Sequence, residues 1–267
     1  MTSPTVRFAV IGSGREGVFM ESPSVRLAYK QSGQGDRILR TDVYKELPSL
    51  LISFVYLDSF LVKRSEYQIT EWVLDSGAFS AHNSGVEIRL EEYIETCKHL
   101  MEKDDQLAEI FSLDVIGDWK ASQKNTEAMW DAGVPAIPCY HIGEPDHVLI
   151  DMAKRYPKIA LGGVAMLRGK KKLNWASQCF ARVYPKKIHG FGFASRSALM
   201  GLPFHSTDAT SWELAPAKYG AWRSFGGARL GIHGSNHPLR VEIDHYLKLQ
   251  RDARSRWKTE MDKLEEL

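Results

Sequence analysis

The segment AIPCYHIGEPDHVLIDMAKRYPKIALGGVA, residues 136–165, decides the fold. Residues 136–142 and 159–165 are short apolar runs of the kind that form buried strands. Between them, residues 147–156 carry apolar side chains at helical spacing, and the pattern ends before Pro157. A strand, a helix and a second strand in this order predict two parallel strands joined by a right-handed crossover.

The same pattern recurs on both sides of this segment. Further apolar runs at residues 6–11, 50–56, 72–74, 110–115, 188–193 and 204–210 predict strands, and residues 90–103, 123–132 and 173–184 predict helices. The sequence therefore contains about eight candidate strands that alternate with helices. This alternation predicts the α/β class, and specifically a closed (β/α)8 barrel of the TIM type.

Three stretches fit the alternation poorly. Residues 13–49 contain many glycines, serines and prolines and no clear helix, and residues 195–202 are short for a crossover helix. Residues 213–240 are irregular and are interpreted as an excursion after the barrel, followed by a charged C-terminal helix from about residue 241 to 267. Because no repeat or linker is visible, we expect a single domain over residues 1–267, with 213–267 outside the barrel.

The composition is that of an ordinary globular protein with a sizeable core. The chain has 267 residues, of which 43% are hydrophobic and 25% charged, and its formal net charge of +2 neither implies nor excludes a nucleic-acid partner. The three cysteines, Cys97, Cys139 and Cys179, have no CxxC spacing, which argues against a zinc finger or a disulfide framework and favours a reducing cytoplasm. Neither a long apolar span nor a basic leader is visible, so we expect no membrane partner and no signal peptide.

Acidic residues lie at the C-terminal ends of three of the predicted strands. These are Asp75 in VLDSGAFS, Asp114 in FSLDVIGD and Asp208 in HSTDATSW. One acid in such a place is often only a helix N-cap, but three at one rim are harder to explain by capping alone. The carboxyl ends of the strands carry the active site of a (β/α)8 barrel, and glycosyl chemistry commonly uses two carboxylates, one nucleophile and one acid/base. The set therefore points to this chemistry.

Other residues at the same rim fit a pocket for a flat ligand. The pair Ser76 and Gly77 predicts a tight turn beside Asp75. The pair Gly162 and Gly163 should weaken its strand, so either a planar ring packs there or a helix lies close to the strand. Both interpretations remain open.

Basic and aromatic residues near the rim have two interpretations each. The run Arg168, Lys170, Lys171 and Lys172 either contacts phosphates beside the pocket or is a solvated loop. Trp119, Phe191, Phe193 and Trp212 either stack on a base or belong to the core.

A glycine motif near the N-terminus suggests a different class. Gly12, Gly14 and Gly17 form GxGxxG after an apolar run, and Asp36 follows about twenty residues later. No helical pattern opens at Gly17, and Pro23 is close by. A nicotinamide-binding Rossmann oxidoreductase is therefore disfavoured.

The ordered set DSGAF, SLD, HIGE, LGGVA, HGFGFAS and STDATSW resembles the tRNA-guanine transglycosylase superfamily. It is most similar to the compact 7-deazaguanine DNA transglycosylases of bacteriophages and bacterial modification clusters, from about residue 50 to about residue 235. The tRNA enzymes carry a CxCxxC…H zinc site after the barrel, whereas this chain has no cysteine beyond Cys179. The resemblance therefore implies no zinc subdomain, no metal in the site and a DNA substrate.

The resemblance also implies roles for individual residues. Asp208 matches the nucleophile, Asp75 matches the aspartate that binds the base and handles its proton, and Asp114 matches the aspartate that reads the guanine edge. His141 stands where the family usually has a glutamine in the base pocket. The remaining matches to that pocket are Ser76, Gly77, Phe79, Gly162, Gly163, Gly190 and Gly192.

The reaction that the resemblance implies is the exchange of guanine in DNA for a 7-deazaguanine, such as 7-cyano-7-deazaguanine. It proceeds through a covalent aspartyl-glycosyl intermediate with retention, needs no cofactor, and requires a flipped or single-stranded guanine. A phage-encoded chain would act in the host cytoplasm. Three alternatives are a tRNA-directed enzyme, a base-releasing N-glycoside hydrolase, and a nucleic-acid-binding protein without catalysis, and the intact Asp75 and Asp208 argue against the last.

Overall fold

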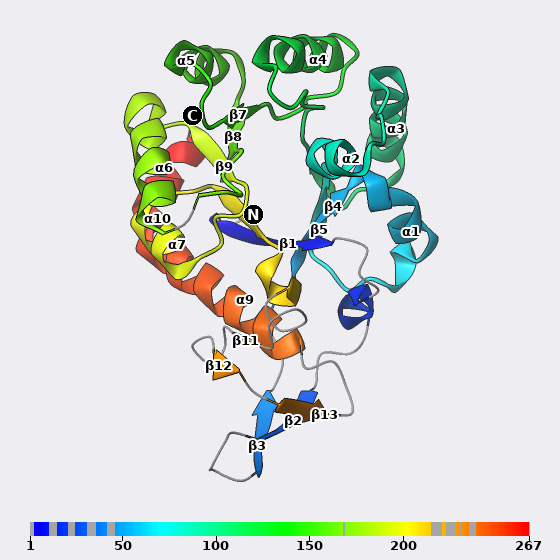
Figure 1. Ribbon diagram of the computed structural model, residues 1–267, viewed down its shortest axis with the longest axis vertical. Helices are drawn as coiled ribbons and strands as arrows, with labels where there is room; N and C mark the ends of the chain where they lie inside the picture. The colour runs from blue at the N-terminus through cyan, green and yellow to red at the C-terminus, as the bar shows by residue number, and fades with distance from the viewer. Residues whose placement is uncertain are drawn as a thin grey trace.

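The computed structural model of the protein is a mixed α/β fold (Figure 1). It describes residues 3–10, 15–20, 25–30, 36–41, 46–167, 169–214, 221–222, 228–229, 231–234 and 239–266. Gly12, Gly14 and Arg168, which the sequence analysis singles out, lie outside these ranges.

Eight parallel strands form the main sheet, in the order β6-β5-β4-β1-β10-β9-β8-β7. They are β1 (Thr5–Val10), β4 (Ser49–Ser53), β5 (Glu71–Asp75), β6 (Leu107–Ile110), β7 (Cys139–His141), β8 (Lys158–Gly162), β9 (Lys187–Gly190) and β10 (Ser206–Ala209). Each of the eight predicted strand regions meets one of them. The prediction for β6 is several residues late, because the charged Glu109 interrupts the apolar run that would have marked this strand.

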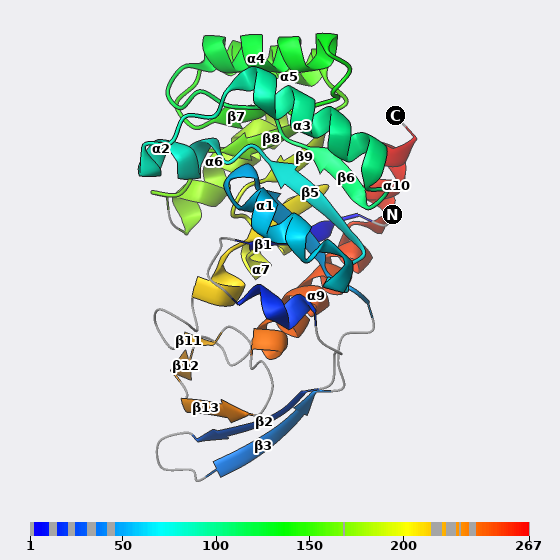
Figure 2. The same cartoon turned by 90° about the vertical axis from the view of Figure 1, so that its right-hand side faces the viewer.

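The two edge strands of this sheet approach each other. Phe111, directly after β6, forms a parallel bridge with Ile137, which precedes β7. The backbone N–H of Ser112 donates to the Ile137 carbonyl at 2.9 Å, and the Ile137 N–H donates to the Ile110 carbonyl at 2.8 Å. The sheet is therefore strongly curled, and the helices lie on its outer side (Figures 1 and 2).

Helices follow most of the strands, as the alternation predicts. They are α1 (Leu57–Val62), α2 (Ala78–Ser84), α3 (Leu90–Lys103), α4 (Trp119–Asp131), α5 (Asp146–Arg155), α6 (Lys170–Val183), α7 (Arg196–Gly201), α9 (Leu239–Arg256) and α10 (Lys258–Glu265), with 3-10 turns η1 (Glu16–Phe19), η2 (Phe54–Tyr56) and η3 (Arg64–Glu66). The predicted helix at 90–103 is confirmed without displacement. Within the described ranges, no helix combines the length and the apolar character needed to span a membrane.

The C-terminal helix is interrupted, which corrects the expectation of one continuous helix. Trp257 separates α9 from α10 with φ −107° and ψ 16°, values that depart from helical geometry. Its indole N–H donates to the Leu199 carbonyl at 2.7 Å, so the tryptophan ties the break to α7.

The connection between β1 and β4 contains strands of its own. Residues 13–49 were expected to show no clear helix, and their described part contains the antiparallel pair β2 (Val25–Lys30) and β3 (Asp36–Thr41), which was not predicted. With β13 (Gly231–Gly234) they form a three-stranded sheet that lies apart from the main sheet in both views. A further short pair joins β11 (Ala221–Trp222) and β12 (Ala228–Arg229). The alternation of the apolar residues Val25, Leu27 and Tyr29 is the sequence signal for strand β2.

The inside of the curled sheet is layered, because successive side chains of a strand point to opposite faces. Near the strand starts the layer is charged. The middle layer is an apolar cluster of Ala9, Leu51, Val73, Phe111, Ile137, Cys139 and Ala160. At the strand ends lie Asp75 of β5, His141 of β7 and Asp208 of β10.

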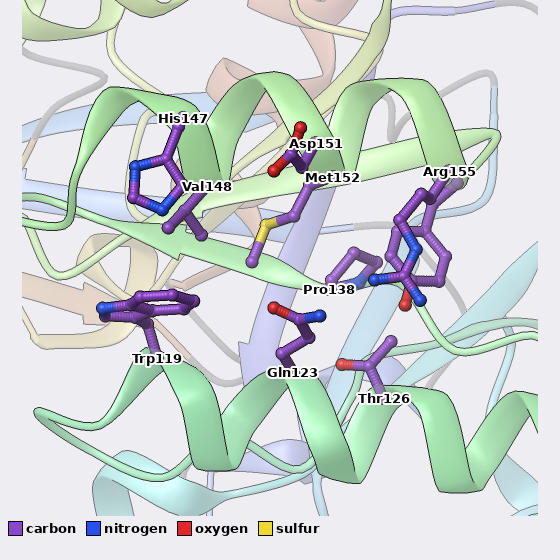
Figure 3. Close-up of a pocket in the computed structure, with 10 residues that line it drawn as sticks. Trp119, Gln123, Thr126, Pro138, His147, Val148, Asp151, Met152 and Arg155 are labelled. Carbon is purple, nitrogen blue, oxygen red and sulfur yellow. The ribbon is translucent and has the colours of Figure 1, made fainter.

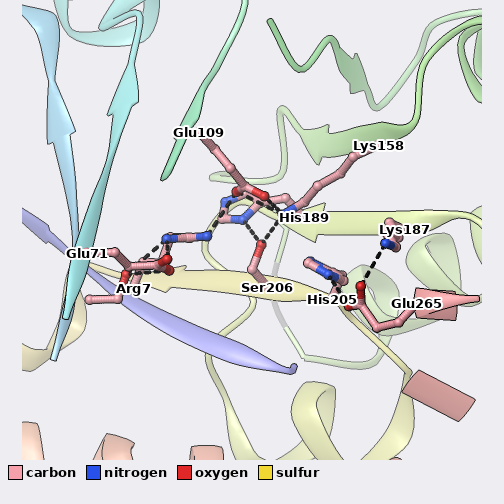
Figure 4. Close-up of polar contacts among 10 residues, drawn as sticks. Arg7, Glu71, Glu109, Lys158, Lys187, His189, His205, Ser206 and Glu265 are labelled. Atoms are coloured by element: carbon pink, nitrogen blue, oxygen red, sulfur yellow. Dashed lines mark hydrogen bonds and ion pairs between the residues drawn. The ribbon is translucent and has the colours of Figure 1, made fainter. Parts of the chain in front are cut away.

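The charged side chains at the strand starts form ion pairs with one another (Figure 4). Arg7 Nη1 lies 2.7 Å from Glu71 Oε1, and Arg7 Nη2 lies 2.9 Å from Glu109 Oε2. Lys158 Nζ lies 2.6 Å from Glu109 Oε1 and donates to Ser206 Oγ at 2.9 Å. Burial raises the pKa of Glu109, but the charges of Lys158 and Arg7 outweigh it and hold this pKa well below its usual range. Two cations and two carboxylates thus balance across β1, β5, β6 and β8.

Candidate active site

Three carboxylates meet at the other end of the strand interior. Asp75 is the last residue of β5, Asp208 lies within β10, and Asp114 follows β6. Burial and the negative charges of Asp114 and Asp208 raise the pKa of Asp75 to about 7, against the hydrogen bonds from the backbone of Gly77 and Ser76. Burial is the larger cause of this shift, and the charges of Asp114 and Asp208 add to it, so the three predicted acids lie within electrostatic range of one another.

Asp208 is held in place by backbone. It is 6% exposed, and its Oδ1 accepts a hydrogen bond from the Gly192 N–H at 2.5 Å. Behind it, His189 is fully buried, with Nε2 at 3.8 Å from the same oxygen and Nδ1 at 2.8 Å from Ser206 Oγ. Burial lowers the pKa of His189 to about 4, so its imidazole carries no charge at neutral pH.

Asp114 faces His141 across the seam between β6 and β7. His141 Nε2 lies 3.3 Å from Asp114 Oδ2, and His141 Nδ1 lies 3.2 Å from Glu144 Oε1. The Cys139 sulfur raises the pKa of His141 well above its usual range, burial opposes this, and the two carboxylates add to the rise. Burial raises the pKa of Asp114, while His141 opposes that shift. Asp114 Oδ1 is buried and has no hydrogen-bond partner among the described residues, which leaves an acceptor for a ligand.

The predicted turn after Asp75 is present. Gly77 has φ 74°, and a Cβ at this position would lie 2.6 Å from Ser53 Oγ. Both the backbone conformation and the lack of space therefore require glycine here. Its N–H donates to Asp75 Oδ2 at 3.2 Å. Ser76 is 2% exposed, whereas Phe79, in the first turn of α2, is 62% exposed. Phe79 is therefore an open rim residue and does not line an enclosed pocket in this state.

The structure explains why position 162 is a glycine. A Cβ there would lie 2.6 Å from Cys139 Sγ and 3.3 Å from His141 Nε2. The crowding comes from side chains of the neighbouring strand β7, and not from a helix on the outer face. Of the two interpretations left open by the sequence, close helix packing is therefore wrong for Gly162. Gly163, with φ 72°, continues this strand end beside His141.

The lysines of the basic run differ in exposure. Lys170 and Lys171 are exposed at the start of α6. Lys172 instead donates from Nζ to the Gly192 carbonyl at 2.6 Å and lies 4.4 Å from the centroid of the Phe193 ring. Burial lowers the pKa of Lys172, and the charge of Asp208 opposes this. These lysines look equivalent in the sequence, whereas in the fold Lys172 lies within electrostatic range of Asp208.

The aromatic candidates are mostly core residues. Trp212 is fully buried against Phe8 and Phe19, and Phe193 packs on Phe204. Phe191 contacts the His189 ring at a centroid distance of 4.7 Å.

Trp119 lines a pocket of about 140 Å³ between α4 and α5 (Figure 3). Its ring meets the ring of His147 edge-on at a centroid distance of 5.5 Å. Asp151 is the single carboxylate among its lining residues, so this pocket lacks an acid pair. A second pocket of about 270 Å³ includes Glu109 and Lys158, whose charges neutralise each other. Neither pocket offers the chemistry of the three carboxylates.

The arrangement at the strand ends combines Asp208, whose carboxylate accepts a backbone hydrogen bond, with Asp75, whose pKa is raised to about 7. Such a pair can supply a nucleophile and a proton carrier in one reaction. Asp114 adds a buried acceptor, and Lys172 adds a cation. Comparison of the chain with protein-family models, with curated proteins and with solved structures finds no match in any of the three.

Proposed function

We propose that the protein is a base-exchange glycosyltransferase that replaces guanine in DNA with a 7-deazaguanine. The observation that carries this proposal is the convergence of Asp75, Asp114 and Asp208 at the carboxyl ends of parallel strands, with the pKa of Asp75 raised to about 7. A glycosyl transfer with retention needs one carboxylate as nucleophile and one carboxyl group that exchanges protons, and we assign these roles to Asp208 and Asp75. The sequence resemblance supports the choice of guanine as the leaving base.

In the proposed reaction, Asp208 attacks C1′ of the target nucleotide, and the bond from C1′ to N9 of guanine breaks. Protonated Asp75 gives its proton to the departing guanine. The incoming 7-deazaguanine then loses its N9 proton to Asp75 as N9 attacks C1′ and releases Asp208. Two inversions at C1′ return the original configuration, and the protons balance without a cofactor.

Recognition of the base falls to Asp114 in this proposal. Its buried Oδ1 accepts hydrogen bonds from the N1–H and 2-amino group of guanine, a donor pair that adenine does not present. The base leaves the helical stack to reach this depth, so we expect single-stranded or flipped DNA as substrate. Lys172, beside Asp208, supplies a cation for the adjacent phosphate.

We also propose that the curled sheet is a closed (β/α)8 barrel. The Phe111–Ile137 bridge and its two flanking hydrogen bonds support closure between β6 and β7. The contact of Lys158 with Glu109 supports it as well, because it joins β8 to β6 near opposite ends of the sheet order. Free thiols at all three cysteines agree with action in a reducing cytoplasm.

A base-exchange assay tests the proposal. The purified chain is incubated with radiolabelled 7-cyano-7-deazaguanine or guanine and, in parallel, with guanine-containing single-stranded DNA or with tRNA. We expect label in DNA and none in tRNA. Asp151→Asn serves as the matched control, since it removes a carboxylate outside the three-acid cluster, and it should retain full incorporation. Label in tRNA alone would show that the substrate is RNA. Release of guanine without incorporation of label would show that the protein is a hydrolase.

A further inference from the structure

Three metal-binding side chains of different types converge beside the carboxylate cluster. One oxygen of Asp114, the sulfur of Cys139 and a ring nitrogen of His141 all lie within 4.8 Å of one another. The distance of 3.3 Å between His141 Nε2 and Asp114 Oδ2 equals the edge of a tetrahedral zinc site, since bonds of about 2.0–2.1 Å at tetrahedral angles set neighbouring ligand atoms about 3.3 Å apart.

The local structure explains why these side chains meet. Cys139 and His141 are two residues apart in β7, so strand alternation points both to the same side. Asp114 is brought alongside because the Phe111–Ile137 bridge joins its segment to the start of β7. Gly162 leaves the space in front of the sulfur free, since a Cβ there would lie 2.6 Å from Cys139 Sγ.

The histidine is also oriented as a metal ligand is. Glu144 Oε1 lies 3.2 Å from His141 Nδ1, and Glu144 Oε2 accepts the His141 backbone N–H at 3.0 Å. A hydrogen-bond partner on one ring nitrogen, whether a carboxylate, a carbonyl or water, fixes the tautomer and turns the other nitrogen toward the metal. Here the other nitrogen, Nε2, lies 3.3 Å from Asp114 Oδ2.

We propose that Asp114, Cys139 and His141 form a binding site for a thiophilic divalent cation of the Zn²⁺ class. The donor set of one thiolate, one imidazole and one carboxylate suits zinc and disfavours magnesium or calcium, which prefer oxygen ligands alone. With three protein ligands the fourth position stays open to water or an anion. The site shares Asp114 with the proposed base pocket, but Oδ2 faces His141, whereas Oδ1 is the atom assigned to guanine.

Metal titration of the full chain tests this site without any nucleic acid. After treatment with a chelator, the protein is titrated with Co²⁺ and monitored for visible tetrahedral bands and a near-ultraviolet thiolate-to-cobalt band, and Zn²⁺ is then added in competition. We expect one equivalent of Co²⁺, displaced by Zn²⁺. Because the readout is the metal itself, its result stands whether or not base exchange is observed.

Variants assign the ligands. Cys139→Ala should abolish the thiolate band and weaken Zn²⁺ binding at least tenfold, whereas Cys179→Ala, which removes another buried free thiol, should change neither. Glu144→Gln should keep the band and weaken binding by about 10–100-fold. If Cys139→Ala does not fold, Asp114→Asn, which preserves side-chain volume, should weaken binding to a similar extent. The proposal is overturned if the unaltered chain binds no Co²⁺, or if the thiolate band survives in Cys139→Ala.

Discussion

The two ends of the strand interior contain similar numbers of carboxylates in opposite electrostatic settings. At the strand starts, Glu71 and Glu109 are each matched by a buried cation, Arg7 or Lys158. At the strand ends, the charges of Asp114 and Asp208 act on Asp75 without a cation bound to it, and its pKa rises to about 7. A buried ion pair leaves an uncompensated charge when one partner is removed, whereas buried like charges cost stability and are typical of functional sites. The first end is therefore structural, and the second is the candidate active site.

The largest expected effect comes from removing the nucleophile at the strand ends. Asp208→Asn should lower base exchange by at least about 10⁴-fold, because the carboxylate forms the covalent bond in the proposed reaction. The unfolding midpoint should change little, since the amide can still accept the hydrogen bond from Gly192. Exchange is measured as label incorporated into DNA under saturating base. Activity within tenfold of the unaltered chain would exclude Asp208 as the nucleophile.

The next largest effect is expected when an ion pair at the strand starts is removed. Glu109→Ala leaves Lys158 buried without its carboxylate partner, so we expect a loss of about 3–5 kcal/mol in the free energy of unfolding. Urea unfolding followed by circular dichroism measures this loss. Glu127→Ala is the matched control, because its partner Arg155 is exposed, and it should cost less than about 1 kcal/mol. Equal losses in the two variants would remove the distinction between the ends.

A smaller effect of opposite sign is expected at Asp75. Its pKa is about 7 in the folded chain against an ordinary 3.8, so between these values the folded state keeps a proton that the unfolded state has released. Stability from this group is therefore lost as the pH rises from about 4 to about 7. Asp75→Asn should remove that loss and be more stable than the unaltered chain at pH 8 by up to about 4 kcal/mol.

Urea unfolding at pH 5 and pH 8 checks this prediction. The same variant should lose base exchange, so stability and activity move in opposite directions. An Asp75→Asn chain that is less stable than the unaltered chain at pH 8 would show that the aspartate is stabilised by its surroundings.

The smallest effect separates two neighbouring lysines. Lys172→Met loses the hydrogen bond to the Gly192 carbonyl, next to the amide that holds Asp208, so we expect about a tenfold fall in kcat. Lys170→Met, on the exposed side, should leave kcat unchanged and reduce the salt dependence of DNA binding by about one phosphate contact. Identical behaviour of the two variants in kcat and in binding would contradict the inward role of Lys172.

The sequence predicts the strands and acids well because both follow local rules. Apolar runs mark all eight strand regions, and an acid near the end of a run marks Asp75, Asp114 and Asp208. The start of β6 is hidden because Glu109 looks like a loop residue until Lys158, on another strand, is placed beside it. The helix break at Trp257 depends in the same way on a distant partner, the Leu199 carbonyl.

The candidate site is only partly visible in the sequence for the same reason. The proximity of Cys139 to Asp114 and the contact of Lys172 with Gly192 arise between separate elements, at no recognisable spacing. Likewise, His189 lies within an apolar strand run, and only the fold sets its imidazole behind Asp208. Contacts that close across the sheet interior thus have no signature in a single sequence.

The most direct test of the central claim is to map a covalent adduct on the protein. The chain is incubated with a guanine-containing oligonucleotide, denatured and digested, and the peptides are examined by mass spectrometry. We predict that the peptide containing Asp208 carries a nucleotide that has lost its guanine, and that Asp208→Asn yields no such peptide. An adduct on a different residue, or base exchange that proceeds undiminished in Asp208→Asn, would contradict the assignment of the strand-end carboxylates to glycosyl transfer.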